Sequence, residues 1–75
     1  MKRLTEFSEG IKVKIKDLRI NKTDTLNLRN LGISKGITVK IVRKSNFKGP
    51  VIIYYRNTEV AIGYTIAKKI FAESA

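Results

Sequence analysis

Cysteine and histidine are both absent from this 75-residue chain. Without thiols the chain can form no disulfide framework, no zinc finger and no cysteine nucleophile. Without imidazole it can form no Ser-His-Asp triad and no histidine switch near neutral pH. The phosphate-binding GxxxxGK[ST] loop and the GxSxG nucleophile motif are missing as well. We therefore expect no catalytic residues and no enzymatic activity.

Long apolar runs are also missing. The longest, Val51–Tyr55, is far shorter than the ~20 residues that span a bilayer as a helix. No apolar segment follows the first residues, Met1–Glu6, so we expect no signal peptide. These features predict a cytoplasmic protein, with residues 1–75 forming a single small domain.

Acidic residues are few. The chain has 6 Asp and Glu residues and 16 Lys and Arg residues, which gives a net charge of +10. The carboxylates are scattered, so we expect no metal site and no cofactor. No acidic residue occurs between Thr25 and Thr58, and this window is expected to give one side of the fold a positive potential. Such a surface would attract an acidic partner, nucleic acid or an anionic membrane. The cations of the window are Arg29, Lys35, Lys40, Arg43, Lys44, Lys48 and Arg56.

Apolar and polar residues alternate in short segments, which is typical of half-buried strands. Ile11, Val13 and Ile15 alternate with lysines, and residues 37–41 repeat the pattern. Further strands are expected at 51–55, at 59–62 and near Phe71. Short strands with brief turns predict a mainly β fold, a small, partly open barrel of about five strands.

One short helix is predicted from Asp24 to Leu31. Asp24 or Thr25 is expected to cap its start, and Gly32 is expected to end it as a residue with positive φ. Gly36 should provide a second sharp turn, whereas 17–23 is expected to be a loop. The leucines expected to face the core are Leu26, Leu28 and Leu31.

The two ends of the chain are expected to contain short turns. Thr5 is a candidate cap for a turn that Gly10 would end. Near the other end, Ile66, Ala67 and Ile70 have the spacing of a last helical turn.

The segment Leu28-Arg29-Asn30-Leu31-Gly32-Ile33-Ser34-Lys35-Gly36 is similar to a motif of the FeoA family, Arg-Leu-x-x-Leu-Gly-Ile-x-x-Gly. The resemblance extends over residues 4–71. It departs from the family pattern at Lys48, at Gly63 and in the 21–23 loop. The remaining matching residues are Leu4, Phe7, Gly10, the Gly49-Pro50 pair, Val60-Ala61-Ile62 and Ala67-x-x-Ile70.

The resemblance implies an SH3-like barrel that is associated with bacterial ferrous iron uptake. It also implies a partner, FeoB, which is a membrane transporter with a cytoplasmic GTPase domain. The matching segment consists mainly of Gly and Leu, which carry no site chemistry, so its residues are expected to determine the fold. These fold-motif residues are Leu28, Leu31, Gly32, Ile33, Gly36 and Ala61.

The basic segment 43–50 is expected to be a hairpin loop that contacts the partner. Within it, Phe47 is flanked by cations, which suits a stacking platform or a protein-interface anchor. The alternative is that Phe47 folds back and caps the barrel. The candidate partner-binding residues are Arg43, Lys44, Phe47, Lys48, Gly49 and Pro50.

A second basic feature is the row Lys12, Lys14 and Lys16. These lysines either follow a phosphate backbone or form a solvated strand face that discourages edge pairing. Together with the net charge, they leave a nucleic-acid-binding barrel as the alternative function. The sequence makes no prediction of oligomeric state.

Overall fold

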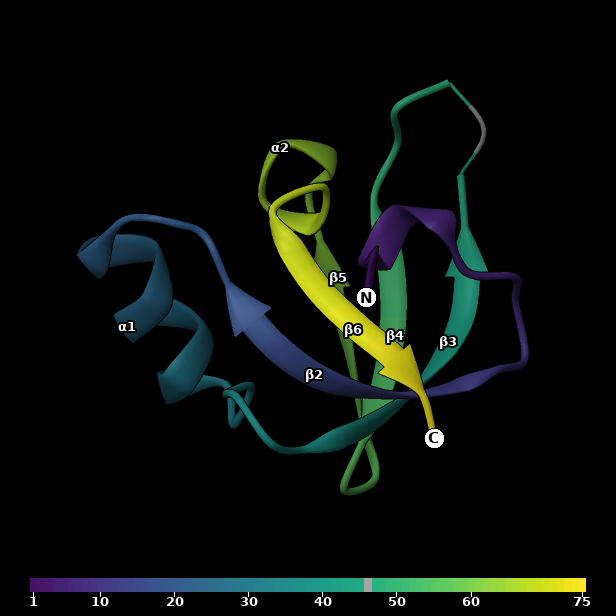
Figure 1. The fold of residues 1–75 in the computed structure, drawn as a ribbon, viewed down its shortest axis with the longest axis horizontal. Coiled ribbons are helices and arrows are strands. Elements are labelled where there is room, and N and C mark those ends of the chain that lie inside the picture. The colour runs from purple at the N-terminus through teal and green to yellow at the C-terminus, as the bar shows by residue number, and fades with distance from the viewer. Residues whose placement is uncertain (46) are drawn as a thin grey trace.

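One antiparallel sheet forms the frame of the chain (Figure 1). The computed structural model describes residues 1–45 and 47–75, and within them six strands occur. The strands follow the spatial order β1-β6-β2-β3-β4-β5. They are β1 (Lys2–Arg3), β2 (Lys12–Leu18), β3 (Thr38–Lys44), β4 (Val51–Tyr55), β5 (Thr58–Ile62) and β6 (Ile70–Ser74).

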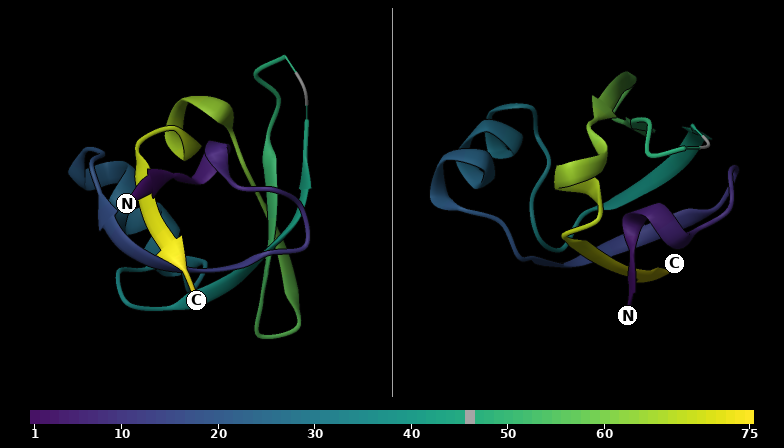
Figure 2. Two further views of the ribbon diagram at one scale, coloured as in Figure 1. Left: turned by 45° about the vertical axis from the view of Figure 1, so that its right-hand side comes forward. Right: turned by 90° about the horizontal axis from the view of Figure 1, so that it is seen from above.

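The sheet curls on itself, as the two views of Figure 2 show. Two register shifts help it to bend, because a bulge increases the local twist of a strand. One lies in β2 between Ile15 and Asp17, and the other lies in β3 between Ile41 and Arg43. The predicted mainly β, SH3-like barrel is confirmed. The strand beyond the expected five is β1, which is too short to leave a pattern in the sequence.

The inner face of the sheet holds the core. Val13 and Ile15 of β2 are fully buried, as are Val39 and Ile41 of β3, so the predicted alternation is confirmed for both strands. Ile11 was expected to belong to the same buried row, but it precedes β2 and is exposed. Leu4, Phe7, Ile33, Ile53 and Ile70 complete the largest part of this core.

The main helix, α1 (Lys22–Asn30), begins earlier than the sequence predicted. Asn21 is its N-cap, and the Asn21 Oδ1 atom accepts a hydrogen bond from the Asp24 N–H at 2.7 Å. The prediction of Asp24 or Thr25 as the cap is therefore wrong. The expected loop 17–23 is also shorter than predicted, because β2 extends to Leu18. Gly32 follows the last turn with φ of +88°, and its predicted positive φ is confirmed.

Only one of the three helix leucines faces the core. Leu28 is 7% exposed, whereas Leu26 and Leu31 are 54% and 57% exposed. Leu26 lies two positions before Leu28, so it points to nearly the opposite side of the helix. Leu31 follows the last helical residue and turns outward with the chain. The prediction that Leu26 and Leu31 close the core is therefore wrong.

Two further turns lie near the chain ends. The 3-10 turn η1 (Leu4–Glu6) is capped at Arg3 rather than at Thr5, and the Arg3 N–H donates to Glu6 Oε1 at 2.8 Å. The second turn, α2 (Tyr64–Ala67), is shorter than the predicted helical turn. Ile70 lies outside it, because the chain has already entered β6.

Candidate partner-binding surface

The loop between β3 and β4 extends beyond the end of the barrel (Figure 1). A backbone hydrogen bond closes its base, where the Ser45 N–H donates to the Pro50 carbonyl at 3.2 Å. Phe47 and Lys48 both have left-handed backbone angles, with φ of 61° and 63°. Non-glycine residues seldom adopt this conformation, so the backbone is locally strained at Phe47 and Lys48.

Gly49 makes this loop possible by the absence of its side chain. A Cβ atom at Gly49 would overlap the Ser45 side chain and would lie 2.7 Å from Ser45 Oγ. The two sides of the loop therefore approach each other more closely than any other residue type would allow.

Phe47 is 99% exposed. Its ring does not cap the barrel, so the structure rejects that alternative of the sequence interpretation. An aromatic side chain that is this exposed gains about 1.5–3 kcal/mol when a partner buries it. The position at the end of a closed hairpin lets a partner reach the ring without moving the barrel.

The predicted cations of the loop have different surroundings. Arg43 and Lys48 are exposed to solvent. Lys44 is half-buried, and its ammonium donates to the Thr5 carbonyl at 3.0 Å. The backbone N–H of Lys44 donates to Glu9 Oε2 at 2.8 Å. Lys44 therefore fastens the end of β3 to the N-terminal segment, which leaves Arg43 and Lys48 as the accessible charges beside Phe47.

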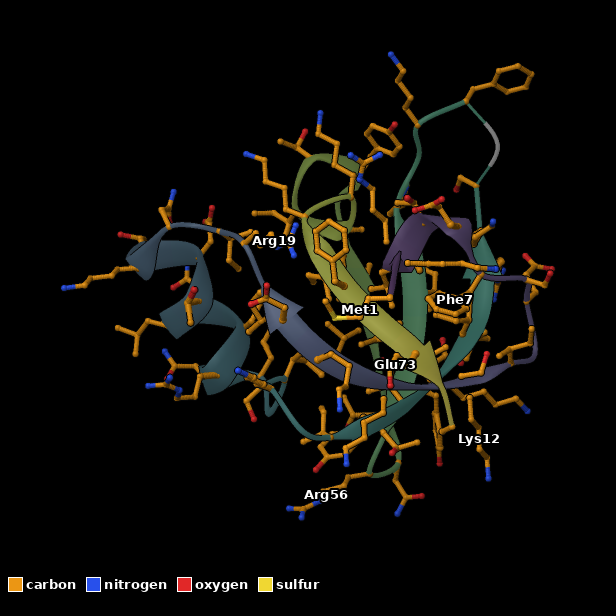
Figure 3. All side chains as sticks on the ribbon, viewed as in Figure 1. Met1, Phe7, Lys12, Arg19, Arg56 and Glu73 are labelled. Carbon is orange, nitrogen blue, oxygen red and sulfur yellow. The ribbon has the colours of Figure 1, made fainter. Side chains whose placement is uncertain are left out.

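The basic residues of the acid-free window do not gather on one side, contrary to the sequence prediction. Arg29 lies on α1 and Lys40 lies within β3. Arg56 follows β4, whereas the loop that contains Phe47 precedes this strand, so the two are at opposite ends of β4. Figure 3 shows Arg56 at the end of the barrel that faces away from the β3–β4 loop. The cations of the window therefore lie at both ends of β4 rather than together.

The lysines of β2 lie on the outer face of the sheet, between buried residues. Lys12 pairs in register with Lys40 of β3, and Lys14 pairs with Glu73 of β6. The Lys16 Nζ atom lies 4.0 Å from Glu73 Oε2. Glu73 thus partly neutralises the charge of Lys14 and Lys16, whereas Lys12 has another lysine opposite it.

The sequence interpretation missed an apolar groove beside α1. Ile20, Lys22, Thr25, Leu26 and Arg29 line it. The signal was present in the spacing of Leu26 and Leu28, because residues two positions apart on a helix point to nearly opposite sides. Cations flank the apolar side chains here as they do in the β3–β4 loop.

The fold-motif residues divide between the core and the surface, because Leu28 and Ile33 are buried whereas Leu31 and Ala61 are exposed. Ile33 is fully buried, and Gly36 has φ of +96° in the turn before β3. Ala61 lies on the exposed side of β5. No substituent within 4 Å restricts Gly36, so the turn requires glycine for its backbone angle alone.

Metal ligands do not come together among the described residues, which contain no group of three or more His, Cys, Asp or Glu side chains within reach of one ion. In the part of the chain that the structure describes, no helix is long and apolar enough to cross a membrane.

Comparison with known proteins adds to this geometry. The family model of the FeoA domain matches residues 2–74. A Methanocaldococcus jannaschii protein, described as a candidate Fe(2+) transport protein A, is 36% identical over 67 residues, covering 89% of this chain and 79% of that protein.

Solved structures with the same fold include FeoA proteins. The solution structure of FeoA from Chlorobium tepidum has a TM-score of 0.86 at 17% identity, covering 96% of this chain and 69% of that one. The crystal structure of an iron uptake regulatory protein (FeoA) has a TM-score of 0.85 at 22% identity, covering 99% of this chain and 96% of that one.

Proposed function

This chain belongs to the FeoA family, and from that premise we propose that it supports ferrous iron uptake by contact with the cytoplasmic side of a FeoB-type transporter. The family is associated with Fe(2+) transport, in which its members are accessory proteins. The resemblance to the FeoA family is confirmed, because the family model matches residues 2–74. In the proposed role the protein works in the cytoplasm, binds a protein and catalyses no reaction.

The exposure of Phe47 carries the proposal. Its side chain is 99% exposed at the end of a closed loop, so it gains nothing from the fold that presents it. Aromatic residues that a partner buries commonly dominate the energy of an interface. Arg43 and Lys48 stand beside the ring as exposed cations, which favour an acidic rim on the partner and accelerate the encounter.

A binding assay with the soluble GTPase domain of a FeoB-type transporter tests the proposal. Phe47→Ala should weaken binding about tenfold or more, because burial of the ring contributes about 1.5–3 kcal/mol. Leu26→Ala is the matched control, since it removes another exposed apolar side chain, from α1. The control should bind as the unmodified protein does. Equal affinity of Phe47→Ala and the unmodified protein would refute the proposed contact.

The exposed cations of the loop are expected to act differently from the ring. Lys48→Glu should slow association, and the effect should fade as salt rises, because a rim charge mainly steers the encounter. The melting temperature of both loop variants should equal that of the unmodified protein, which separates loss of binding from loss of fold.

The net charge of +10 favours nucleic-acid binding as a second candidate function. The same assay with random duplex DNA as the ligand distinguishes the two. Binding to DNA would fall steeply with salt, because each neutralised phosphate releases counterions. Binding through Phe47 would survive moderate salt.

A further inference from the structure

The outer face of β2 and β3 carries four lysine side chains. We call Lys12, Lys14, Lys16 and Lys40 the lysine face. The β2 members alternate with buried Val13 and Ile15, so all of them project to the same outer side. Lys40 joins them through its register with Lys12.

Two acidic residues border the lysine face: Glu59 of β5 pairs in register with Tyr54, one strand beyond Lys40, and Glu73 lies on the β6 side. Glu73 lies opposite Lys14 and within 4.0 Å of Lys16 Nζ. At the other end, Lys12 and Lys40 stand directly opposite each other. Across residues 1–45 and 47–75, the ion pairs within 4.0 Å are Lys16–Glu73 and Arg19–Asp17, so neither of these two lysines has an acidic partner.

The backbone brings Lys12 and Lys40 as near as an antiparallel ladder allows. The adjacent pair Ile11–Ile41 is hydrogen-bonded, since the Ile41 N–H donates to the Ile11 carbonyl at 2.9 Å, and three pairs beyond the two lysines along the ladder the Ile15 N–H donates to the Ile37 carbonyl at 2.9 Å. Hydrogen-bonded and non-hydrogen-bonded pairs alternate, which places the two lysines at a non-hydrogen-bonded position with a Cα separation of about 4.5 Å. Like charges in this arrangement destabilise the sheet, and an anion between them relieves the repulsion.

The row continues from Lys40 to Tyr54 on β4. Tyr54 is 39% exposed, and its hydroxyl donates to Asn57 Oδ1 at 2.7 Å. A shallow groove runs along this row, with Arg56 at its end. The amphipathic ring of Tyr54 therefore lies beside the flexible ammonium groups of the lysine face.

From these observations we propose that the lysine face docks on the surface of an anionic lipid bilayer. Single-stranded nucleic acid is bound on exposed aromatic platforms. In this groove Tyr54 is 39% exposed and its hydroxyl is bonded to Asn57, whereas Tyr55 is half-buried with the Arg56 guanidinium over its ring. Clustered lysines suit the diffuse charge of anionic headgroups, and tyrosine suits the interface between headgroups and acyl chains. The inference stands apart from the proposed transporter contact, because the loop that contains Phe47 lies at the other end of β4.

Cosedimentation of the full chain with lipid vesicles tests this proposal. The protein should sediment with vesicles of equal parts phosphatidylcholine and phosphatidylglycerol, and it should stay in solution with phosphatidylcholine alone. Each lysine at an anionic surface contributes about fivefold in affinity, so Lys40→Glu should weaken binding about tenfold or more. Lys22→Glu, an equal change of charge at an exposed position on α1, should weaken binding less than about twofold.

A second measurement separates loss of binding from loss of fold. Lys40→Glu places opposite charges where Lys12 and Lys40 repel, so its melting temperature without lipid should exceed that of the unmodified protein. A lower melting temperature would refute the repulsion from which the proposal starts. Equal weakening by Lys40→Glu and Lys22→Glu would overturn the proposal, because net charge alone would then account for binding. Tighter binding to random duplex DNA than to the anionic vesicles, lost in Lys40→Glu, would assign the face to nucleic acid instead.

Discussion

Replacing Gly49 with alanine tests how closely the β3–β4 loop is packed. The φ angle of Gly49 lies outside the left-handed region, so the backbone itself accepts alanine. In that case the substitution would stabilise the fold by about 0.4–1 kcal/mol through the unfolded chain. The new Cβ atom, however, would overlap the Ser45 side chain, and overpacking costs about 1–3 kcal/mol where the neighbouring atoms must shift.

The cost of the overlap exceeds the gain from the reduced entropy of the unfolded chain. We therefore expect Gly49→Ala to lower the free energy of unfolding by about 1–2 kcal/mol. A domain of this size loses about 4–8 °C of melting temperature for each kcal/mol, which thermal unfolding followed by circular dichroism resolves easily. The same strain would displace the Phe47 ring, so partner binding should weaken as well.

Ser45→Gly in the Gly49→Ala background is the decisive control. It removes the overlapping atoms, and the nearest remaining atom is the Cα of residue 45 at 3.6 Å, an ordinary contact. The double variant should therefore recover stability relative to Gly49→Ala, with a coupling of about 1 kcal/mol in a double-mutant cycle. An unchanged melting temperature in Gly49→Ala, or strictly additive effects in the cycle, would refute the packing that we describe.

Three further predictions concern the scaffold. Gly32→Val should destabilise the protein by more than about 1 kcal/mol in thermal unfolding, because a β-branched residue is disfavoured at a φ of +88°. Lys44→Met should lower the free energy of unfolding by about 1.5–3 kcal/mol through the lost bond to the Thr5 carbonyl, whereas Lys48→Met should leave it unchanged. The hydrogen bond from Arg19 holds the pKa of Asp17 below its ordinary value. The ionised Asp17 side chain therefore stabilises the fold at pH values above its ordinary pKa, and this stabilisation is lost as the pH falls through the lowered pKa. Arg19→Gln should raise that pKa in an NMR titration of the carboxyl group.

Local patterns in the sequence were sufficient for much of the fold. Alternation located the strands around Val13 and Val39, the apolar run 51–55 located the strand around Ile53, and the glycine after the last helical turn located the end of α1. The start of α1 was less certain because Asn21 and Asp24 are both good caps, three residues apart. The structure uses Asn21, whose side chain accepts the hydrogen bond from the Asp24 N–H, and Asp24 lies in the first turn. A pattern that contains two adequate caps cannot decide between them.

The candidate site depended more on contacts that no local pattern encodes. Lys44 and Phe47 are near neighbours in the sequence, and both were predicted to face a partner. Lys44 instead bonds to Thr5, 39 positions away, because the curl of the sheet brings the N-terminal segment across the end of β3. For Phe47 the sequence allowed both a capping and an exposed position. The left-handed backbone at Phe47 and Lys48 turns the ring away from the barrel.

The position of β6 in the sheet has a consequence for synthesis on the ribosome. β6 comes after the other five strands in the chain, yet it lies between β1 and β2, and Lys2 pairs with Ala72. Chains are made at about 5–20 residues per second, so one edge of β2 stays without its partner for several seconds of translation. The lysines of β2 keep this temporary edge from pairing with another nascent chain. The sheet is therefore completed only when residues 70–74 have been made and can pair with both β1 and β2.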